Sequence, residues 1–229
     1  MYFDWTYVVI VFPMVIISMI AQLGVQSTYE KYSRVFSKRS LTAAQAARAI
    51  LDANGLQNVG IGRIAGNLTD HYDPRTNMIS LSDGVYESHS VAAIGVAAHE
   101  AGHAIQHATG YGPIKLRSAI VPITQFGSKL SVPLIIIGLL LGFYQLAYAG
   151  IILFGTVVVF QLVTLPTEFN ASRRAIEVLS NGYLDETETK GAKKVLSAAA
   201  MTYVAALFVS LASLLRFILI VSGGRSRRD

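Results

Sequence analysis

Long apolar runs alternate with polar segments along this chain. The apolar runs cover about residues 3–25, 132–145, 148–165 and 195–221. A helix that crosses the hydrocarbon core of a bilayer needs about 20 mostly apolar residues. The stretch from Val132 to Leu165 is too long for one span, so we expect it to break near Tyr144–Ala149 as a tight hairpin. The pattern predicts a mostly α-helical integral membrane protein with about four transmembrane helices.

The first apolar run is expected to be a permanent anchor. A removed signal peptide typically has basic residues before its apolar run and a small-residue cleavage site after it. This run has neither feature. Pro13 lies inside the run, where a spanning helix tolerates it as a kink. We therefore count this run as the first span.

The polar segments between the spans, residues 26–131 and 166–194, are expected to fold outside the bilayer. In the first of them, Thr42 is a suitable N-cap for a helix through Leu51, and Gly55 is a suitable stop. We predict that these segments and the spans form one domain over residues 1–229.

Residues 58–81 have a different texture, rich in Gly, Asn, Asp and Thr and without helical periodicity. Asp73–Asn77 is typical of a turn, and residues 67–72 and 78–81 flank it. We predict a short β-hairpin here, and hence a small sheet beside the helices.

The composition supports a membrane protein. The chain is 52% hydrophobic and 14% charged, and its mean hydropathy is +0.47. Its net charge of +5 is explained by basic residues that flank the spans. No basic and aromatic platform accompanies this charge, so the sequence does not favour nucleic-acid binding.

The distribution of Lys and Arg predicts the orientation of the spans. Ten basic residues lie in residues 26–131, five lie in 166–194, and the expected hairpin turn has none. Because cytoplasmic loops carry the excess of Lys and Arg, we expect both segments on the cytoplasmic side of the plasma membrane. Arg225, Arg227 and Arg228 fall on the opposite side in a four-span topology, unless the last segment is re-entrant or peripheral.

The sequence His99-Glu100-Ala101-Gly102-His103 is the pattern with the clearest chemistry. Ser90 is a suitable N-cap for a helix that ends near Gly110, and residues four apart share one helix face, so both imidazoles can reach one metal ion. In the alternative interpretation, the two His only satisfy each other on a packed helix. The apolar flanking residues argue for a metal, because buried imidazoles and carboxylates are costly unless they are paired or coordinated.

The remaining ligand of such a metal has to be a His or a carboxylate, because the chain has no Cys. His107 lies about 12 Å along the helix from His99, which is too far for one ion. Glu168 directly follows the third span and is the better candidate, next to Pro166 as a first-turn proline of a new helix. Alternatively, Glu168 caps that helix or pairs with Arg173 or Arg174. Three other acidic residues are expected to face solvent: Glu177, Glu186 and Glu188.

Three stretches together resemble the YugP-like family of membrane zinc metallopeptidases: Ala98–His107, Leu165–Arg174, and Asp70–Pro74 with Ser80–Ser82. More distantly, the chain is similar to HtpX-type proteases and CAAX prenyl proteases, in which a Glu after H-E-x-x-H completes the zinc site. The resemblance implies that Glu168 is the third ligand of one zinc ion per chain. In those distant relatives an Asp four residues after the ligand Glu orients a zinc-binding His. Ser172 stands at that position here, so the contact is weaker or is supplied elsewhere.

We interpret the chain as a membrane-bound zinc endopeptidase in which His99, His103 and Glu168 hold the metal and Glu100 is the general base. His71, Tyr72, Arg173 and Arg174 are candidate oxyanion donors, although the two Arg are better suited to lipid phosphate.

The expected partners are the lipid bilayer and a protein or peptide substrate, which is a membrane or membrane-proximal protein. The predicted hairpin could align an extended substrate on an edge strand, or be only structural. An accessory subunit and an oligomer both stay open. The alternative function is a non-proteolytic membrane metal-binding, transport or scaffold protein that uses the same ligands.

Overall fold

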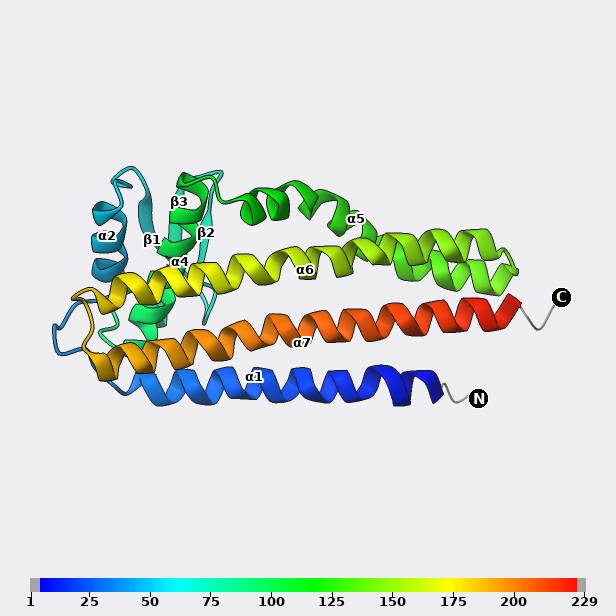
Figure 1. The fold of residues 1–229 in the computed structure, drawn as a ribbon, viewed down its shortest axis with the longest axis horizontal. Coiled ribbons are helices and arrows are strands. Elements are labelled where there is room, and N and C mark those ends of the chain that lie inside the picture. The colour runs from blue at the N-terminus through cyan, green and yellow to red at the C-terminus, as the bar shows by residue number, and fades with distance from the viewer. Residues whose placement is uncertain (1–4, 226–229) are drawn as a thin grey trace. The chain divides into compact units, whose positions relative to one another are not determined.

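The computed structural model describes residues 5–225, and most of them are helical. Within this range, four helices are long and apolar enough to cross a membrane, as predicted (Figure 1). They are η1 and α1 (Tyr7–Val11 and Phe12–Ser33), α5 (Gly112–Leu141), α6 (Tyr144–Ser180) and α7 (Glu186–Arg225). Residues 3 and 4 of the first expected span, and Arg227 and Arg228 of the basic tail, lie outside the described residues.

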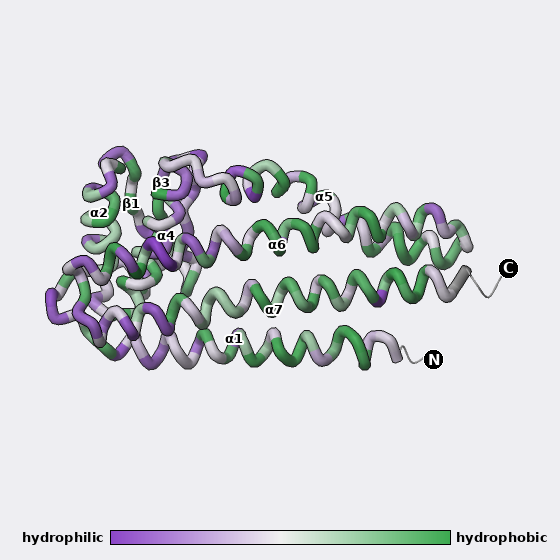
Figure 2. The backbone as a smooth tube through the Cα atoms, in the orientation of Figure 1, coloured by the Kyte–Doolittle hydropathy of each residue, from purple (hydrophilic) through white to green (hydrophobic). Residues whose placement is uncertain are grey.

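Figure 2 shows that hydrophobic residues predominate along most of the long helices, whereas hydrophilic residues gather on the turns and on the ends of α1, α6 and α7 beside the short elements. Helix α5 begins at Gly112, well before the predicted start of the second span, and continues through Pro122 and Pro133. The expected tight hairpin is present, but its break lies just before Tyr144–Ala149, because these residues are already helical. The chain turns instead at Gly142, whose φ of 68° ends α5.

Helix α6 corrects a second prediction. Pro166 lies inside α6 and does not open a new helix, so the third span and the polar segment after it form one continuous helix of 37 residues. An internal proline removes one backbone hydrogen bond, and long helices of membrane proteins tolerate this loss. Glu168 is therefore a mid-helix residue, which excludes the interpretation that it caps a helix.

The described chain forms two compact units. Unit 1 comprises the membrane-spanning parts of the long helices, and unit 2 comprises residues 22–115 and 166–201. In unit 1, α5 and α6 pack closely through glycines: a Cβ on Gly138 would lie 2.5 Å from the Ala147 nitrogen, and one on Gly150 would lie 2.6 Å from the Ser131 oxygen. Small residues at helix contacts are typical of proteins in membranes. The prediction of one domain over residues 1–229 stays a prediction.

Unit 2 contains a sheet of three strands in the order β1-β3-β2: β1 (Gly60–Ile64), β2 (His71–Asp73) and β3 (Met78–Ser82). Strands β2 and β3 are antiparallel and form the predicted hairpin. Strand β1, which the sequence analysis did not predict, pairs in parallel with β3. Its residues, Gly-Ile-Gly-Arg-Ile, carry only weak strand signals.

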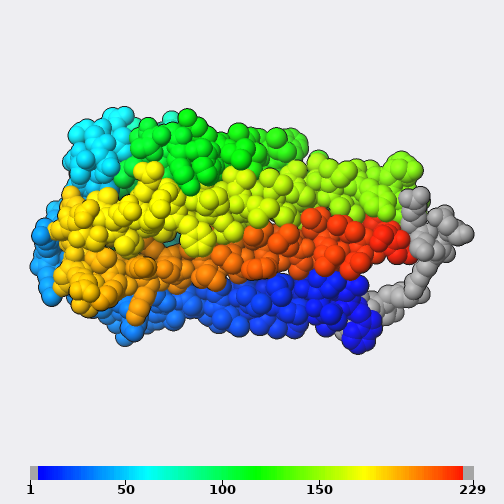
Figure 3. All heavy atoms as spheres, viewed as in Figure 1, coloured from blue at the N-terminus to red at the C-terminus, as the bar shows by residue number. Residues whose placement is uncertain are grey.

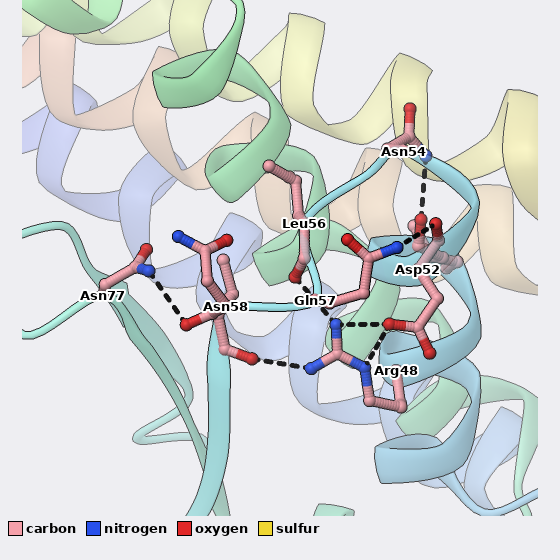
Figure 4. A network of polar contacts seen from close by, with 9 residues as sticks. Arg48, Asp52, Asn54, Leu56, Gln57, Asn58 and Asn77 are labelled. Atoms are coloured by element: carbon pink, nitrogen blue, oxygen red, sulfur yellow. Dashed lines mark hydrogen bonds and ion pairs between the residues drawn. The ribbon is translucent and has the colours of Figure 1, made fainter.

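Helix α2 (Ala43–Ala53) confirms the prediction at Thr42, which forms a capping box with Gln45. At its other end, Arg48 fixes the connection to β1. The guanidinium donates to the carbonyl oxygens of Leu56 and Val59 at 2.8 and 2.6 Å and pairs with Asp52 at 2.8 Å (Figure 4). These bonds satisfy backbone oxygens that no helix or strand pairs.

The core of unit 2 surrounds α4 (Val91–Ala108), which follows the short helix α3 (Asp83–Tyr86). Ser90 caps α4 as predicted and accepts a hydrogen bond from the Ala93 nitrogen at 3.2 Å. Alanines on α4 are buried against α2 and the sheet, whose fully buried side chains include Ile50, Leu51, Ile79 and Leu81. Helix α4 is therefore a buried central helix, as its apolar sequence indicates.

One acidic residue disagrees with the sequence prediction. Glu188 is only 5% exposed, not solvent-facing. Its carboxylate accepts hydrogen bonds from the backbone nitrogens of Lys38 and Asp185, both at 2.8 Å. It thereby ties the loop after α1 to the start of α7, where an anion is also favoured by the helix dipole.

Helices α4 and α6 make a close contact at Gly102. A Cβ at this position would lie 2.7 Å from the carbonyl oxygen of Ala171 and 3.2 Å from its Cα. Those atoms belong to the α6 backbone and cannot rotate away as a flexible side chain would. Gly102 thus allows the two helices to approach to a distance that no other residue permits.

We predict that Gly102→Ala destabilises the protein by about 1–3 kcal/mol, although alanine is the better helix former. The matched control is Gly84→Ala in α3, where an added Cβ meets nothing within 4 Å. Thermal unfolding of the detergent-solubilised protein measures both changes. We expect a lower midpoint for the first variant only, and equal midpoints would contradict the close contact.

Candidate metal centre

Helix α4 places His99 and His103 one turn apart on the face toward α6. Their rings lie edge to face, with centroids 4.7 Å apart. Each side chain is largely buried, 15% exposed for His99 and 10% for His103. Two imidazoles thus meet in a site that water reaches only in part.

Glu168 of α6 faces both rings. Its Oε2 atom lies 3.2 Å from Nε2 of His99 and 3.6 Å from Nε2 of His103, and its side chain is 3% exposed. The ligand atoms of these residues all lie within 4.8 Å of one another. The three residues come from helices far apart in sequence, and their ligand atoms converge on one point.

This geometry fits zinc. Two ligand atoms that each lie about 2.1 Å from a tetrahedral zinc ion are about 3.4 Å apart. The two distances to Glu168, 3.2 and 3.6 Å, are close to that value. Two imidazole nitrogens and one carboxylate oxygen are also a donor set that catalytic zinc sites use, with a fourth position left for water.

The alternative roles of Glu168 find no support in the described contacts. Its carboxylate contacts imidazoles, whereas Arg174 donates through Nε to Oδ1 of Asn170 at 2.8 Å and lies over the ring of Tyr111. His107 stays outside the cluster, as predicted, and stacks 5.6 Å from the ring of Tyr72. Among the described residues, His99, His103 and Glu168 are the set that could share a metal ion.

Ser172 lies against the far side of His99. Its Oγ is 3.1 Å from Nδ1 of His99. The hydroxyl therefore occupies the place where the distant relatives are expected to have an Asp, and the contact exists although its partner is neutral. The hydroxyl can accept a hydrogen bond from Nδ1–H, which leaves the Nε2 lone pair of His99 available for a metal, or it can donate one to Nδ1.

The far side of His103 carries a contact that the sequence analysis missed. Nδ1 of His103 lies 3.0 Å from Oε1 of Gln106, which is fully buried. The Gln106 amide nitrogen donates to the Thr167 carbonyl at 2.8 Å and to Oδ1 of Asn170 at 3.0 Å. The spacing of three residues from His103 was the available signal, since residues i and i+3 are neighbours on a helix.

The contacts of Thr167 and Arg174 determine which group donates and which accepts in the hydrogen bonds that lead from them to His103. The Thr167 carbonyl can only accept and the Arg174 guanidinium can only donate, so the Gln106 nitrogen faces Thr167 and the Asn170 oxygen faces Arg174. Oε1 of Gln106 must then accept from Nδ1–H of His103. Neutral His103 is thereby held in the tautomer whose Nε2 carries a lone pair toward Glu168.

The pKa of His103 is raised. Burial by itself lowers it, but the hydrogen bond to Glu168 and the negative charges of Glu100 and Glu168 outweigh burial. A metal must displace a proton from the same nitrogen, so its affinity falls as the pH drops through this raised pKa.

Glu100 follows His99 on α4 and is 8% exposed. Within residues 5–225, its carboxylate has no hydrogen-bond partner, unlike the carboxylate of Glu168. Glu100 lies close enough to His103 for its negative charge to raise the pKa of that imidazole.

The other candidates differ in their surroundings. His71 lies exposed on β2 and contacts the Thr69 carbonyl through Nδ1 at 2.9 Å, and the hydroxyl of Tyr72 contacts Asn77 at 3.0 Å. Arg174 belongs to the hydrogen-bond chain of Gln106. Arg173 is exposed and makes none of these contacts. No described contact brings His71, Tyr72 or Arg173 to the three ligand atoms.

Fold and site together are those of a membrane protein with a potential zinc centre. Residues 7–222 match the family described as “Putative neutral zinc metallopeptidase”, and the chain belongs to this family. It is also 50% identical over 206 residues to the Bacillus subtilis (strain 168) protein named “Putative membrane protease YugP”, covering 90% of this chain and 92% of that protein. No solved structure matches the chain. These findings confirm the resemblance drawn from the motifs.

We predict that Gln106→Leu weakens zinc binding by about 10-fold to 100-fold, because His103 loses the acceptor that fixes its tautomer. Titration of the purified protein against a chelator of known zinc affinity measures the effect. Gln57→Leu makes the same chemical change at an exposed residue whose amide contacts the Asp52 carbonyl, and should leave the affinity unchanged. Equal affinities for parent and Gln106→Leu would show that Gln106 does not support the site.

Proposed function

We propose that the chain is a membrane-bound, zinc-dependent endopeptidase that hydrolyses peptide bonds of membrane or membrane-proximal proteins. The observation that carries this proposal is the convergence of Nε2 of His99, Nε2 of His103 and Oε2 of Glu168 beside Glu100. Membership of a zinc metallopeptidase family and the name of its relative support the same chemistry.

In this mechanism His99, His103 and Glu168 hold one zinc ion per chain. When bound, zinc polarises the scissile carbonyl and lowers the pKa of a water molecule toward about 7. Glu100 accepts a proton from the attacking water and passes it to the leaving amine. Gln106 keeps His103 in the required tautomer through Nδ1, and Ser172 contacts Nδ1 of His99 and helps to orient its ring.

Strand β2 is the proposed platform for the substrate. It lies at the edge of the three-stranded sheet and pairs with β3 on one side only. The ring contact between Tyr72 and His107 connects it to α4, the helix that carries the catalytic sequence. An extended peptide could add to this edge and gain main-chain hydrogen bonds regardless of its sequence.

The alternative is a membrane protein that binds or transports a metal with the same ligands, or a scaffold. A transporter needs polar groups along its spans. Of the polar residues in the last span, Arg216 lies over the rings of Tyr7 and Phe217, at 5.4 and 5.6 Å from their centroids, which accounts for its charge without an ion path. A Glu100 carboxylate beside the triad is also unnecessary for binding alone, which favours the hydrolase.

The decisive variant is Glu100→Gln, which keeps the size of the side chain but cannot accept a proton. We predict that it retains zinc while its rate of cleaving an unfolded protein such as casein falls by about 100-fold to 10,000-fold. Cleavage and metal content are measured on the same purified, detergent-solubilised sample.

Glu186→Gln is the matched control, because the side chain of Glu186 is exposed and pairs only with Lys190 on the surface. It should cleave as the parent does. Undiminished turnover by Glu100→Gln would remove Glu100 from the mechanism. If the parent and Glu100→Gln both contain zinc and neither cleaves the substrate, the result would favour the non-proteolytic metal-binding protein.

We further propose that the chain lies in the plasma membrane with the site on the cytoplasmic side, since basic residues concentrate in the segments that carry it. The chain lacks Cys, so single cysteines report topology directly. Cysteine at exposed Asn54, in unit 2, should react with an impermeant maleimide only after the cells are opened. Cysteine at exposed Phe143, in the α5–α6 turn, should react in intact cells. The reverse pattern would place the site outside.

A further inference from the structure

Unit 2 contains a cavity that the proposed catalysis does not use. It has a volume of about 310 Å³ and lies between α6 and α7, where Figure 3 shows the surface hollowed between the two segments. Ligand pockets in proteins start at about this size. Ser172, which contacts His99, forms part of its wall.

Apolar and basic residues line different parts of the cavity. Phe169 and Leu196 are the lining residues nearest in sequence to the apolar stretches of α6 and α7, and Phe169 is 47% exposed. Arg173 and Lys193 lie about one helical turn further from those stretches, on the same two helices. The cavity thus has an apolar end toward the spans and a cationic rim beyond it.

The two cations have no partner among the residues that the structure describes. Within residues 5–225, neither the guanidinium of Arg173 nor the ammonium of Lys193 makes a hydrogen bond or ion pair. Two other basic residues of these helices are engaged: Arg174 bonds Asn170, and Lys190 pairs with Glu186. The sequence prediction that both Arg meet lipid phosphate therefore suits Arg173 but not Arg174.

A second cavity, of about 580 Å³, adds to the positive charge at this level. Lys31 of α1 and three lysines of α7 line it, and it shares Lys193 and Ser197 with the first cavity. Glu177 is the acidic residue in the wall of the α6–α7 cavity, and it can accept hydrogen bonds from a hydroxyl group. Basic pockets beside spans at the membrane surface suit phospholipid headgroups.

We propose that the α6–α7 cavity binds the headgroup of an anionic phospholipid such as phosphatidylglycerol. The phosphodiester lies between Arg173 and Lys193, the headgroup hydroxyls face Glu177, and the acyl chains leave past Phe169 and Leu196. The bound lipid would touch Ser172, which also contacts His99. Lipid binding requires neither zinc nor hydrolysis, and it stands or falls independently of the proposed function.

Native mass spectrometry of the detergent-solubilised full chain, titrated with phosphatidylglycerol or phosphatidylcholine, tests the proposal. We expect the parent to bind phosphatidylglycerol several-fold more tightly. Arg173→Gln/Lys193→Gln should bind it about 30-fold more weakly at low ionic strength, because each basic residue contributes about a factor of five. Millimolar inorganic phosphate should not displace the lipid, since it lacks the acyl chains.

The matched control is Arg39→Gln/Lys115→Gln, which removes the same charge from exposed residues outside both cavities. It should retain most of the affinity, and the unfolding midpoint of each variant verifies the fold. Equal losses in the two double variants would overturn the proposal, because the lipid would then respond to surface charge alone. Equal binding of the two lipids, or displacement by free phosphate, would overturn it as well.

Discussion

The close contact between Gly102 of α4 and the α6 backbone at Ala171 is the constraint on which the site depends. His99 and His103 flank Gly102 on α4, while Glu168 and Ser172 flank Ala171 on α6. One contact between two helices therefore brings the carboxylate to both Nε2 atoms and the hydroxyl to Nδ1 of His99. A wider separation would leave Glu168 buried near two imidazoles without reaching them.

The polar groups of the site are acceptable in a buried position because each ligand has a second partner. Nδ1 of His99 meets Ser172, and Nδ1 of His103 meets Gln106, whose own amide bonds lead to a backbone carbonyl and to Asn170. Such a chain resists rearrangement, because reversing one bond would leave a buried donor facing a donor. The same arrangement aims the Nε2 atoms of both rings at one point, so it prepares the site for a metal before any metal binds.

The parts of this arrangement that depend on local spacing could be predicted from the sequence. The caps at Thr42 and Ser90, the hairpin and the pair His99 and His103 all follow from residues close along the chain. Glu168 was the better candidate from the sequence, but the choice against its alternative roles needed the family resemblance, because its contacts join residues 65 or more positions apart. The predictions for Pro166 and Glu188 failed for a related reason: a continuous α6 and distant backbone donors determine their roles. Gln106 was missed because an amide has no chemistry of its own until its neighbours are known.

The central claim is that the ligand atoms of His99, His103 and Glu168 share one zinc ion, and the metal content of purified variants tests it most directly. We predict one zinc per chain for the parent and for Glu177→Ala, which removes a carboxylate two to three turns further along α6. Glu168→Ala should contain almost none, since two imidazoles alone hold zinc far more weakly. Equal zinc in all three proteins would contradict the account, because Glu168 could not then be a ligand.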